Sequence, residues 1–182
     1  MDKQEPAATG HDAASLAATS GVQAPGDVPA VSAAHLRHVM GHFASGVVIV
    51  GGIDSLGPVG LTCQSFFSLS LDPPLVAIAP SHTSTSWPRI AAQGAFAVSI
   101  LSAQQQEVSR SFSVSGIDKF EGVAWRTAHT GSPIIEGALA WVDCRIEKVH
   151  EAGDHYLVTA RVLHAGHLDG QPLLYFRGQY VA

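Results

Sequence analysis

The sequence has few charged residues and no long apolar run. Only 14% of its 182 residues are Asp, Glu, Lys or Arg, and its formal net charge is −5. Such a composition supplies no basic surface, which argues against nucleic acid as the main partner. No apolar segment approaches the roughly 20 residues needed to span a bilayer, and the N-terminus lacks a basic stretch followed by an apolar core. We therefore expect a cytoplasmic protein that binds neither nucleic acid nor a membrane.

Residues that form disulfides or bind metals are also sparse. The two cysteines, Cys63 and Cys144, cannot form a disulfide framework, and neither belongs to a CxxC pair. Free cysteines are usually buried, although Cys63 lies within a cluster of hydroxyl residues, so a role in lining a ligand stays open. His38 and His42 have the spacing of two helical metal ligands, but no carboxylate is placed to complete a site. We expect no metal site.

The common motifs of nucleotide-binding and hydrolytic enzymes are missing. The glycine pair Gly51-Gly52 is not part of a GxGxxG fingerprint, and there is neither a GxxxxGK loop nor a GxSxG elbow. A nucleotide, if one is bound, must therefore be bound by a different fold.

The composition changes once along the chain. Residues 1–31 are mostly small and polar and cannot bury enough surface to offset the entropy of ordering, so we interpret them as a flexible N-terminal tail. With 46% hydrophobic residues overall, residues 32–182 suffice for one domain with its own core.

Within this domain, strand patterns outnumber helix patterns. Ser32 is a good helix cap, and we expect its helix to end near Gly46. Two further helices are predicted to begin near Ser84 or Ser86 and after Ser102. The apolar and alternating segments predict strands at 47–50, 59–62, 66–71, 75–79, 95–101, 138–149, 155–164, 173–176 and 179–181. The two longest are joined by a four-residue turn, 151–154. Because strands and helices do not alternate, we predict a mainly β fold, an antiparallel β-barrel with peripheral helices.

The segment from Gly60 to Trp87 contains two clusters of hydroxyl-bearing residues. One is 62–65 (TCQS) and the other is 81–86 (SHTSTS), and each follows a strand-like run. Hydroxyls and free N–H groups beside a helix start are typical of an anion site. Since the clusters contain few charges, we expect a neutral, polar-edged aromatic ligand with a phosphate.

In the order and spacing of several segments, the chain resembles the flavin reductase-like family. These segments are MGHFASGVVIV (40–50), GLTCQSFFSLSLDPPLVAIAPS (60–81), FAVSILSAQQQEVSRSF (96–112), DKFEG (118–122) and AGDHYLVTARV (152–162). The resemblance covers nearly everything except the tail. It implies a split β-barrel of the FMN-binding type, a homodimer, and FMN or FAD in a groove near the subunit boundary.

The resemblance also implies roles for particular residues. It places Gly60, Leu61, Thr62 and Cys63 along the isoalloxazine ring, Gln64, Ser65 and Phe66 near its polar edge and ribityl chain, and Ser81, His82, Ser84, Thr85 and Ser86 at the phosphate end. His155 matches the family's histidine beside the nicotinamide, as a catalytic residue. The chain departs from the family in having Gln64 where Asn is common, and in having only His82 where the second loop often has a basic residue.

The predicted function is that of an NAD(P)H-dependent flavin reductase. It transfers a hydride from NADH or NADPH to FMN or FAD, and the reduced flavin diffuses to a separate monooxygenase. The alternative is a flavin-binding electron carrier without nicotinamide turnover; a barrel that binds haem or a pyridoxal-type ligand is a third possibility. From the residues alone, the alternative for His155 is a rim histidine bonded to Asp154 or to the backbone. Tyr175 and Arg177 either reach the phosphate end or pack on the surface.

Overall fold

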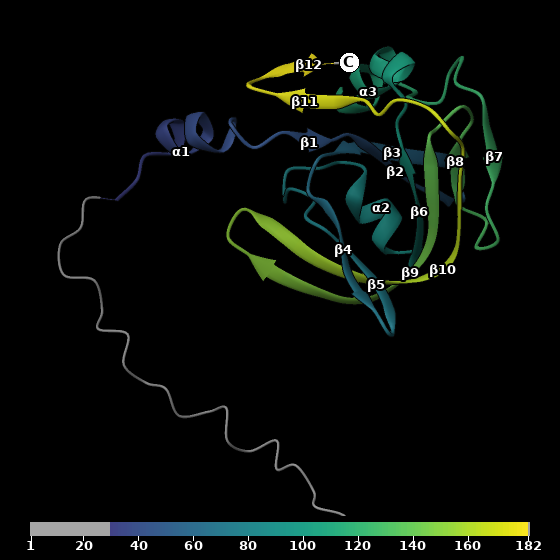
Figure 1. The fold of residues 1–182 in the computed structure, drawn as a ribbon. Coiled ribbons are helices and arrows are strands. Elements are labelled where there is room, and N and C mark those ends of the chain that lie inside the picture. The colour runs from purple at the N-terminus through teal and green to yellow at the C-terminus, as the bar shows by residue number, and fades with distance from the viewer. Residues whose placement is uncertain (1–29, 182) are drawn as a thin grey trace, which may run out of the picture.

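The structure is a computed structural model that describes residues 30–181. Most of the predicted tail, residues 1–29, lies outside these described residues. The prediction of a mainly β protein with antiparallel sheets and few helices is confirmed, because every strand pairing is antiparallel (Figure 1). None of the helices within residues 30–181 has the length and hydrophobicity of a membrane-spanning helix.

One large sheet carries most of the fold. Its seven strands, in spatial order, are β3 (Gly57–Cys63), β2 (Val48–Asp54), β6 (Ala95–Ile100), β9 (Ala140–Ala152), β10 (His155–His167), β5 (Pro74–Ile78) and β4 (Phe66–Leu71). The end strands β3 and β4 are not paired with each other among the described residues, so this sheet is not a closed barrel.

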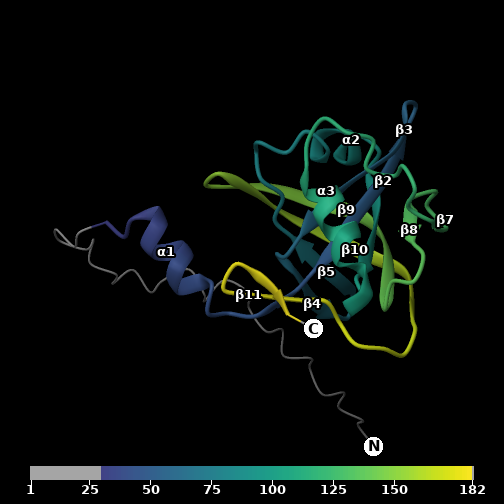
Figure 2. The same cartoon turned by 90° about the horizontal axis from the view of Figure 1, so that it is seen from above.

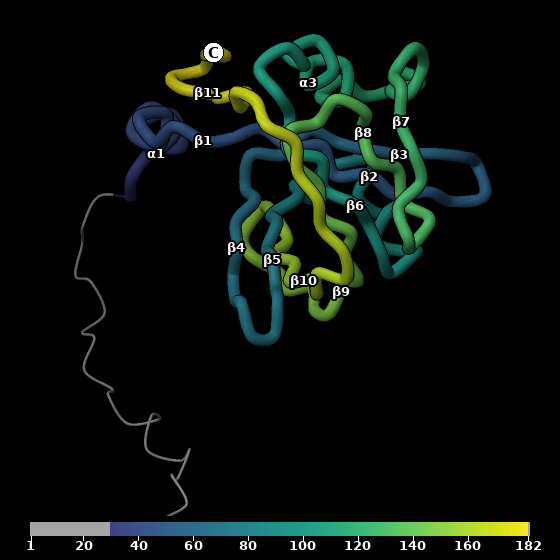
Figure 3. Tube along the Cα trace, turned by 45° about the vertical axis from the view of Figure 1, so that its right-hand side comes forward, coloured from purple at the N-terminus to yellow at the C-terminus, as the bar shows by residue number. Residues whose placement is uncertain are grey.

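Two smaller sheets complete the strands. One contains β1 (Ser45–Gly46), β11 (Leu174–Phe176) and β12 (Gln179–Val181), and the other contains β7 (Trp125–Thr127) and β8 (Pro133–Ile135). After β10 the chain crosses the molecule to reach β11, which pairs with β1 near the start of the domain (Figure 3). The sequence patterns did not predict β7 and β8, because neither segment, WRT nor PII, alternates between apolar and polar residues.

The helices are short and lie outside the large sheet. They are α1 (Ala33–Met40), α2 (Trp87–Ala91), the 3₁₀ turn η1 (Ala103–Gln105) and α3 (Gln106–Ser113). The prediction that Ser32 caps the first helix is confirmed, because its side chain accepts a hydrogen bond from His35 N at 3.2 Å. The predicted end near Gly46 is wrong: α1 stops at Met40, and Ser45–Gly46 pair with β11 instead.

Strand β2 divides the core into two clusters. The alternation of a strand sends Val48 and Val50 to one face and Ile49 to the other. The first cluster contains Ile78, Phe96 and Val158. The second cluster is built around Phe112, Leu101 and Leu173. Both faces of β2 are therefore buried, and α3 and β11 are held against the second face.

The hairpin between β9 and β10 has a tighter turn than predicted. Strand β9 continues to Ala152, which pairs with His155, so the turn is Gly153-Asp154 and not the four residues 151–154. Gly153 has φ +69°, a left-handed conformation that glycine adopts without a Cβ clash. His155 consequently begins β10 directly after the turn.

Candidate functional site

The two hydroxyl-rich clusters meet in one groove of about 620 Å³, which we call the first groove. All of the predicted site residues line it except Gly60, Phe66 and His82. Its lining residues are Leu61, Thr62, Cys63, Gln64, Ser65, Ala79, Pro80, Ser81, Thr83, Ser84, Thr85, Ser86, Phe112, Ser113, Ser115, Lys119, His155, Tyr175 and Tyr180. Within the described residues, no carboxylate lines this groove.

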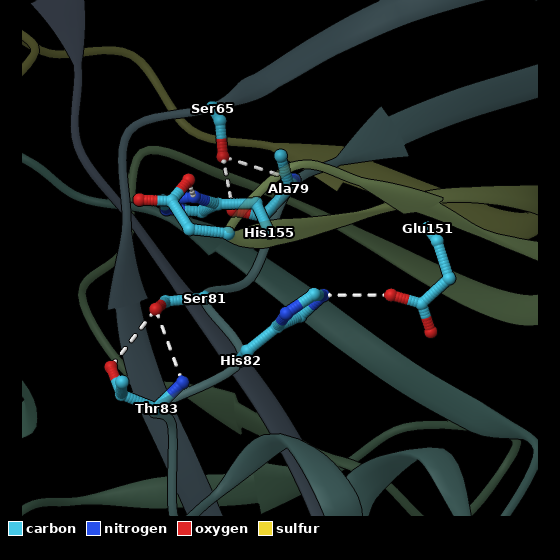
Figure 4. Close-up of polar contacts among 8 residues, drawn as sticks. Ser65, Ala79, Ser81, His82, Thr83, Glu151 and His155 are labelled. Atoms are coloured by element: carbon cyan, nitrogen blue, oxygen red, sulfur yellow. Dashed lines mark hydrogen bonds and ion pairs between the residues drawn. The ribbon is translucent and has the colours of Figure 1, made fainter.

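In the first cluster, between β3 and β4, the hydroxyl groups form hydrogen bonds with the protein's own backbone. Thr62 Oγ1 donates to Ser109 O at 2.6 Å. Ser65 Oγ donates to Ala79 O and accepts from Ala79 N, both at 3.0 Å, which joins the ends of β3 and β5 (Figure 4). By contrast, the N–H groups of Gln64 and Ser65 donate to no oxygen atom among the described residues. In this cluster the donors left for a ligand are thus these backbone N–H groups and the side-chain amide of Gln64, rather than the hydroxyls expected from the sequence.

The second cluster is fastened to the β9–β10 turn by backbone contacts. Ser81 forms an isolated β-bridge with His155, Tyr156 N donates to Pro80 O at 2.9 Å, and His82 N donates to Asp154 O at 3.0 Å. These contacts bring His155 to the wall of the first groove. The ring of His155 is 44% exposed, and its Nδ1 lies 2.7 Å from Asp154 Oδ1. His155 therefore bonds to Asp154 and also lines the groove, and its role beside a nicotinamide stays a prediction.

His82 points away from the first groove. Its Nε2 lies 3.0 Å from Glu151 Oε2, and its ring packs on Tyr156 with centroids 4.3 Å apart. Figure 4 shows the ring directed toward Glu151, on the side opposite Thr83. His82 thus connects the second loop to β9, and it is not the basic residue at the phosphate end.

The first turn of α2 offers fewer free N–H groups than the sequence suggested. Trp87 N donates to Ser84 Oγ at 3.1 Å, and Pro88 has no N–H. The free donors lie just before this helix, because the N–H groups of Thr85 and Ser86 have no acceptor among the described residues.

Lys119 supplies the positive charge at this end of the first groove. Its Nζ donates to Gly60 O at 3.1 Å, Ser86 Oγ at 3.2 Å and Phe112 O at 3.0 Å. Among the described residues it has no carboxylate partner. Partial burial lowers the pKa of this ammonium, and a bound anion would raise it again.

The sequence identified the segment around Lys119 but not its role. The DKFEG motif is one of the segments that carry the family resemblance, but the sequence does not indicate which groups its lysine contacts. The missing signal was spatial, because Gly60 and Lys119 are 59 residues apart in the chain.

The remaining candidates are divided between the groove and its surroundings. Phe66 packs against the first core cluster. Gly60 lines a neighbouring hollow that shares Thr85, Ser86 and Lys119 with the first groove. Tyr175 lines the first groove, whereas Arg177 lies beside α1. Tyr180, which the sequence analysis did not single out, lines the groove and bonds through its hydroxyl to Ser109 Oγ at 2.8 Å.

Both cysteines are buried, as expected for free thiols. Burial raises the pKa of Cys63, and burial together with Asp143 raises that of Cys144 to about 12. Cys63 also lines the first groove. Its thiol therefore stays protonated and contributes a neutral wall.

Comparison with known proteins identifies the family. Residues 40–182 match the model of the flavin reductase like domain. The chain belongs to this family. It is 43% identical over 152 residues, 83% of this chain and 78% of the relative, to the flavin-dependent monooxygenase reductase subunit HsaB of Rhodococcus jostii (strain RHA1). The FMN reductase (NADH) SmoA of Agrobacterium fabrum (strain C58 / ATCC 33970) is 39% identical over 144 residues, 79% of this chain and 82% of the relative.

A solved structure of the same family agrees with this assignment. The NADH:FAD oxidoreductase SgcE6 of Streptomyces globisporus C-1027, in complex with NAD and FAD fragments, has a TM-score of 0.78 and 35% sequence identity, over 82% of this chain and 91% of that chain. The family predicted from the sequence is confirmed.

Proposed function

We propose that this flavin reductase-like protein uses a reduced nicotinamide to reduce FMN or FAD held in the first groove. The observation that carries the proposal is the groove itself: among the described residues its lining has no carboxylate, and it brings together N–H groups that have no acceptor and the ammonium of Lys119. The predicted activity and cofactors are confirmed at the level of the family, whose members include an NADH-dependent FMN reductase and an NADH:FAD oxidoreductase.

The groove suits a flavin in size and in polarity. A volume of about 620 Å³ lies in the usual range for small-molecule sites. Its neutral walls, which include the protonated Cys63 and Tyr175, fit a tricyclic aromatic ring. The free N–H groups of Gln64 and Ser65 suit the carbonyl edge of that ring, and Thr85, Ser86 and Lys119 suit a phosphate.

The chemistry of hydride transfer belongs to the two cofactors when they are bound. The protein's residues bind the two cofactors and orient them. The N–H groups at Gln64 and Ser65 are fixed in advance by the Ser65–Ala79 bonds, so they stabilise negative charge at the carbonyl edge without rearranging. The absence of a carboxylate from the described lining avoids repulsion of that charge. His155, which also lines the groove, is proposed to bind the nicotinamide amide or the dinucleotide phosphates.

The proposed partner of the reduced flavin is a separate monooxygenase. Relatives named as reductase subunits of flavin-dependent monooxygenases support this part of the prediction. A cytoplasmic location stays a prediction from the sequence.

We also propose a homodimer in which each chain forms the split barrel expected from the sequence. The apolar side chains of Leu36, Val39, Met40 and Phe43 on and after α1 are each at least 49% exposed. Helix α1 has no buried residue, and it lies away from the large sheet in both views (Figure 2). An exposed apolar stripe of this kind favours contact with a second chain.

The decisive experiment is steady-state turnover with NADH or NADPH against FMN, FAD and riboflavin. A flavin reductase oxidises at least one nicotinamide in a flavin-dependent manner. Tight flavin binding without oxidation of either nicotinamide contradicts the proposal and favours the electron carrier.

A further inference from the structure

A hollow of about 670 Å³ is lined by α1 and by the turn that joins β11 to β12. We call it the basic hollow, because four of its lining side chains are arginine or histidine and none of the described residues that line it is a carboxylate. Its lining includes Arg37, His38, Gly41 and His42, on and directly after α1, and Arg177 and Gly178 of the turn. None of these residues lines the first groove. Figure 3 shows α1 beside β11, outside the large sheet.

The basic hollow and the exposed apolar stripe lie on different faces of α1. With about 3.6 residues per helical turn, residues three and four apart share a face. Leu36, Val39 and Met40 therefore form one face, and Arg37 and His38 lie on the other side of the helix. A contact between two chains through the apolar stripe does not use the basic hollow.

The two arginines of the basic hollow have no anionic partner within residues 30–181. Elsewhere in the chain Arg89, Arg110 and Arg161 each pair with a carboxylate. Arg37 and Arg177 form no ion pair and donate no side-chain hydrogen bond to any of the described residues. Two guanidinium groups that share one hollow without a carboxylate are suited to bind an anion.

The carbonyl groups at the end of α1 do not account for these cations. Arginine and histidine near the end of a helix often interact with its unpaired carbonyl groups. Here each of the last four carbonyl oxygens already accepts a hydrogen bond at 2.9–3.1 Å: Arg37 O from Gly41 N, His38 O from His42 Nδ1, Val39 O from His42 N, and Met40 O from Phe43 N. The guanidinium groups are therefore not needed to satisfy the helix end.

Arg177 is an unusual residue for its position in the turn. Phe176 pairs with Gln179, so Arg177 and Gly178 form a two-residue turn, with φ values of +50° and +81°. Such a turn favours Asn, Asp or Gly at its first position, because the left-handed region is strained for other side chains. Arg177 N donates to Gly41 O at 2.9 Å, which fixes the turn against the end of α1. A strained residue held in this way is typical of a binding site.

We propose that the basic hollow binds a phosphate-type dianion. The planar guanidinium groups of Arg37 and Arg177 present pairs of N–H donors that match phosphate oxygens. The rings of His38 and His42, with centroids 5.3 Å apart, supply further donors when they are protonated. The volume leaves room for the organic part of a phosphomonoester as well as for the free ion. This site goes beyond the proposed function, because it requires neither flavin nor nicotinamide.

The test is isothermal titration calorimetry at constant ionic strength, without flavin or nicotinamide, using inorganic phosphate and glycerol phosphate as probes. The double variant Arg37→Gln/Arg177→Asn removes both guanidinium groups, and Asn suits the left-handed turn, so the variant should unfold in urea at least as late as the wild type. We expect it to bind each probe at least about tenfold more weakly than the wild type.

The matched control is Arg145→Gln/Lys148→Gln, which removes two positive charges from exposed positions of β9 that line neither the first groove nor the basic hollow. It should change the affinity by less than about twofold. The two probes distinguish the sources of the phosphate group. Tighter binding of glycerol phosphate indicates an organic phosphate, and equal or tighter binding of inorganic phosphate indicates the free ion.

Amide NMR signals locate the bound anion. The signals of Gly41 and Gly178 should move when phosphate is added to the wild type, but not when it is added to Arg37→Gln/Arg177→Asn. The proposal is overturned if the wild type shows no saturable binding, or if the two double variants bind phosphate equally well. It is also overturned if Lys119→Met abolishes the binding, because the phosphate then occupies the first groove. None of these measurements depends on turnover, so they are separate from a failure of the proposed function.

Discussion

Asp154 Oδ1 lies 2.7 Å from Nδ1 of His155, the first residue of β10, and this contact orients the ring at the wall of the first groove. The hydrogen bond from His155 is the main reason that the pKa of Asp154 lies below its ordinary value. Among the described residues Nε2 has no hydrogen-bond partner. One nitrogen of the ring is therefore held by the protein, and the other is available to a ligand.

Replacing His155 with Ala should impair the use of the nicotinamide but not the binding of flavin. One lost hydrogen bond contributes about 1 kcal/mol, so we expect the KM for NADH to rise about fivefold to tenfold while the dissociation constant for the flavin stays within about twofold. The control is His150→Ala, on the exposed part of β9. Unaltered steady-state parameters in His155→Ala contradict the role proposed for this ring.

Lys119→Met should weaken FMN and FAD more than riboflavin. The three N–H groups of the ammonium already donate to protein oxygens, so the ammonium attracts a phosphate as a nearby positive charge, and its loss should raise the dissociation constants of the phosphorylated flavins about 10- to 100-fold. Riboflavin has no phosphate and should bind almost as before. Titration of the three flavins measures the difference, and Lys148→Met, at an exposed position of β9, is the matched control. Equal weakening of all three flavins shows that Lys119 acts only through its bonds to Gly60 and Phe112.

The sequence predicted the parts of the site that follow from local pattern. The alternation of 155–164 predicted β10, and the hydroxyl clusters at 62–65 and 81–86 predicted two walls of one groove. Pattern within a short segment fixes which residues follow a strand, and adjacent strands then bring those ends together.

What the sequence did not predict depends on contacts between distant segments. Lys119 donates a hydrogen bond to Gly60, which is 59 residues away in the chain. His82 pairs with Glu151 outside the groove. Neither contact leaves a periodic signal. The cap residue Ser32 likewise predicted a helix, but not that Leu36 and Phe43 would be exposed.

At position 60 there is no space for a side chain. A Cβ at this position would lie 2.6 Å from Cε1 and 2.8 Å from Cδ1 of Phe112, which is fully buried. We expect Gly60→Ala to reduce the free energy of unfolding by roughly 1–3 kcal/mol, as overpacked cores do. Urea unfolding measures the loss. The control is Gly46→Ala, where a Cβ meets nothing within 4 Å.

The double variant Gly60→Ala/Phe112→Leu separates a steric effect from other causes. The smaller leucine makes room for the methyl group, so the two substitutions should cost less together than the sum of their separate effects. Additive losses in the double variant argue that the contact with Phe112 is not the reason for the glycine.

The ion pair between Asp54 and Arg89 should make stability depend on pH in the acid range. The hydrogen bond from Arg89 is the main cause that lowers the pKa of Asp54 from its ordinary value of 3.8 to about 2. Because the folded state holds this carboxylate ionised, its contribution is complete at neutral pH and is lost as the pH falls through 3.8 toward about 2. Asp54→Asn should therefore be less stable than the wild type at pH 7, and the difference should shrink as the pH falls through that window. A constant difference between pH 7 and pH 2.5, measured by urea unfolding, contradicts this assignment.

The exposed stripe on and after α1 predicts the state of association. Leu36, Met40 and Phe43 are 53%, 56% and 75% exposed, and contact with a second chain would remove this apolar surface from water. A charge buried in such a contact is costly, so Met40→Asp/Phe43→Asp should shift the protein from dimer to monomer in sedimentation velocity. Leu168→Asp adds the same charge at a leucine that is 63% exposed and should leave the dimer intact. If the wild type sediments as a monomer at every concentration, the stripe does not join two copies of this chain, and the proposed homodimer is wrong even if the reductase activity is present.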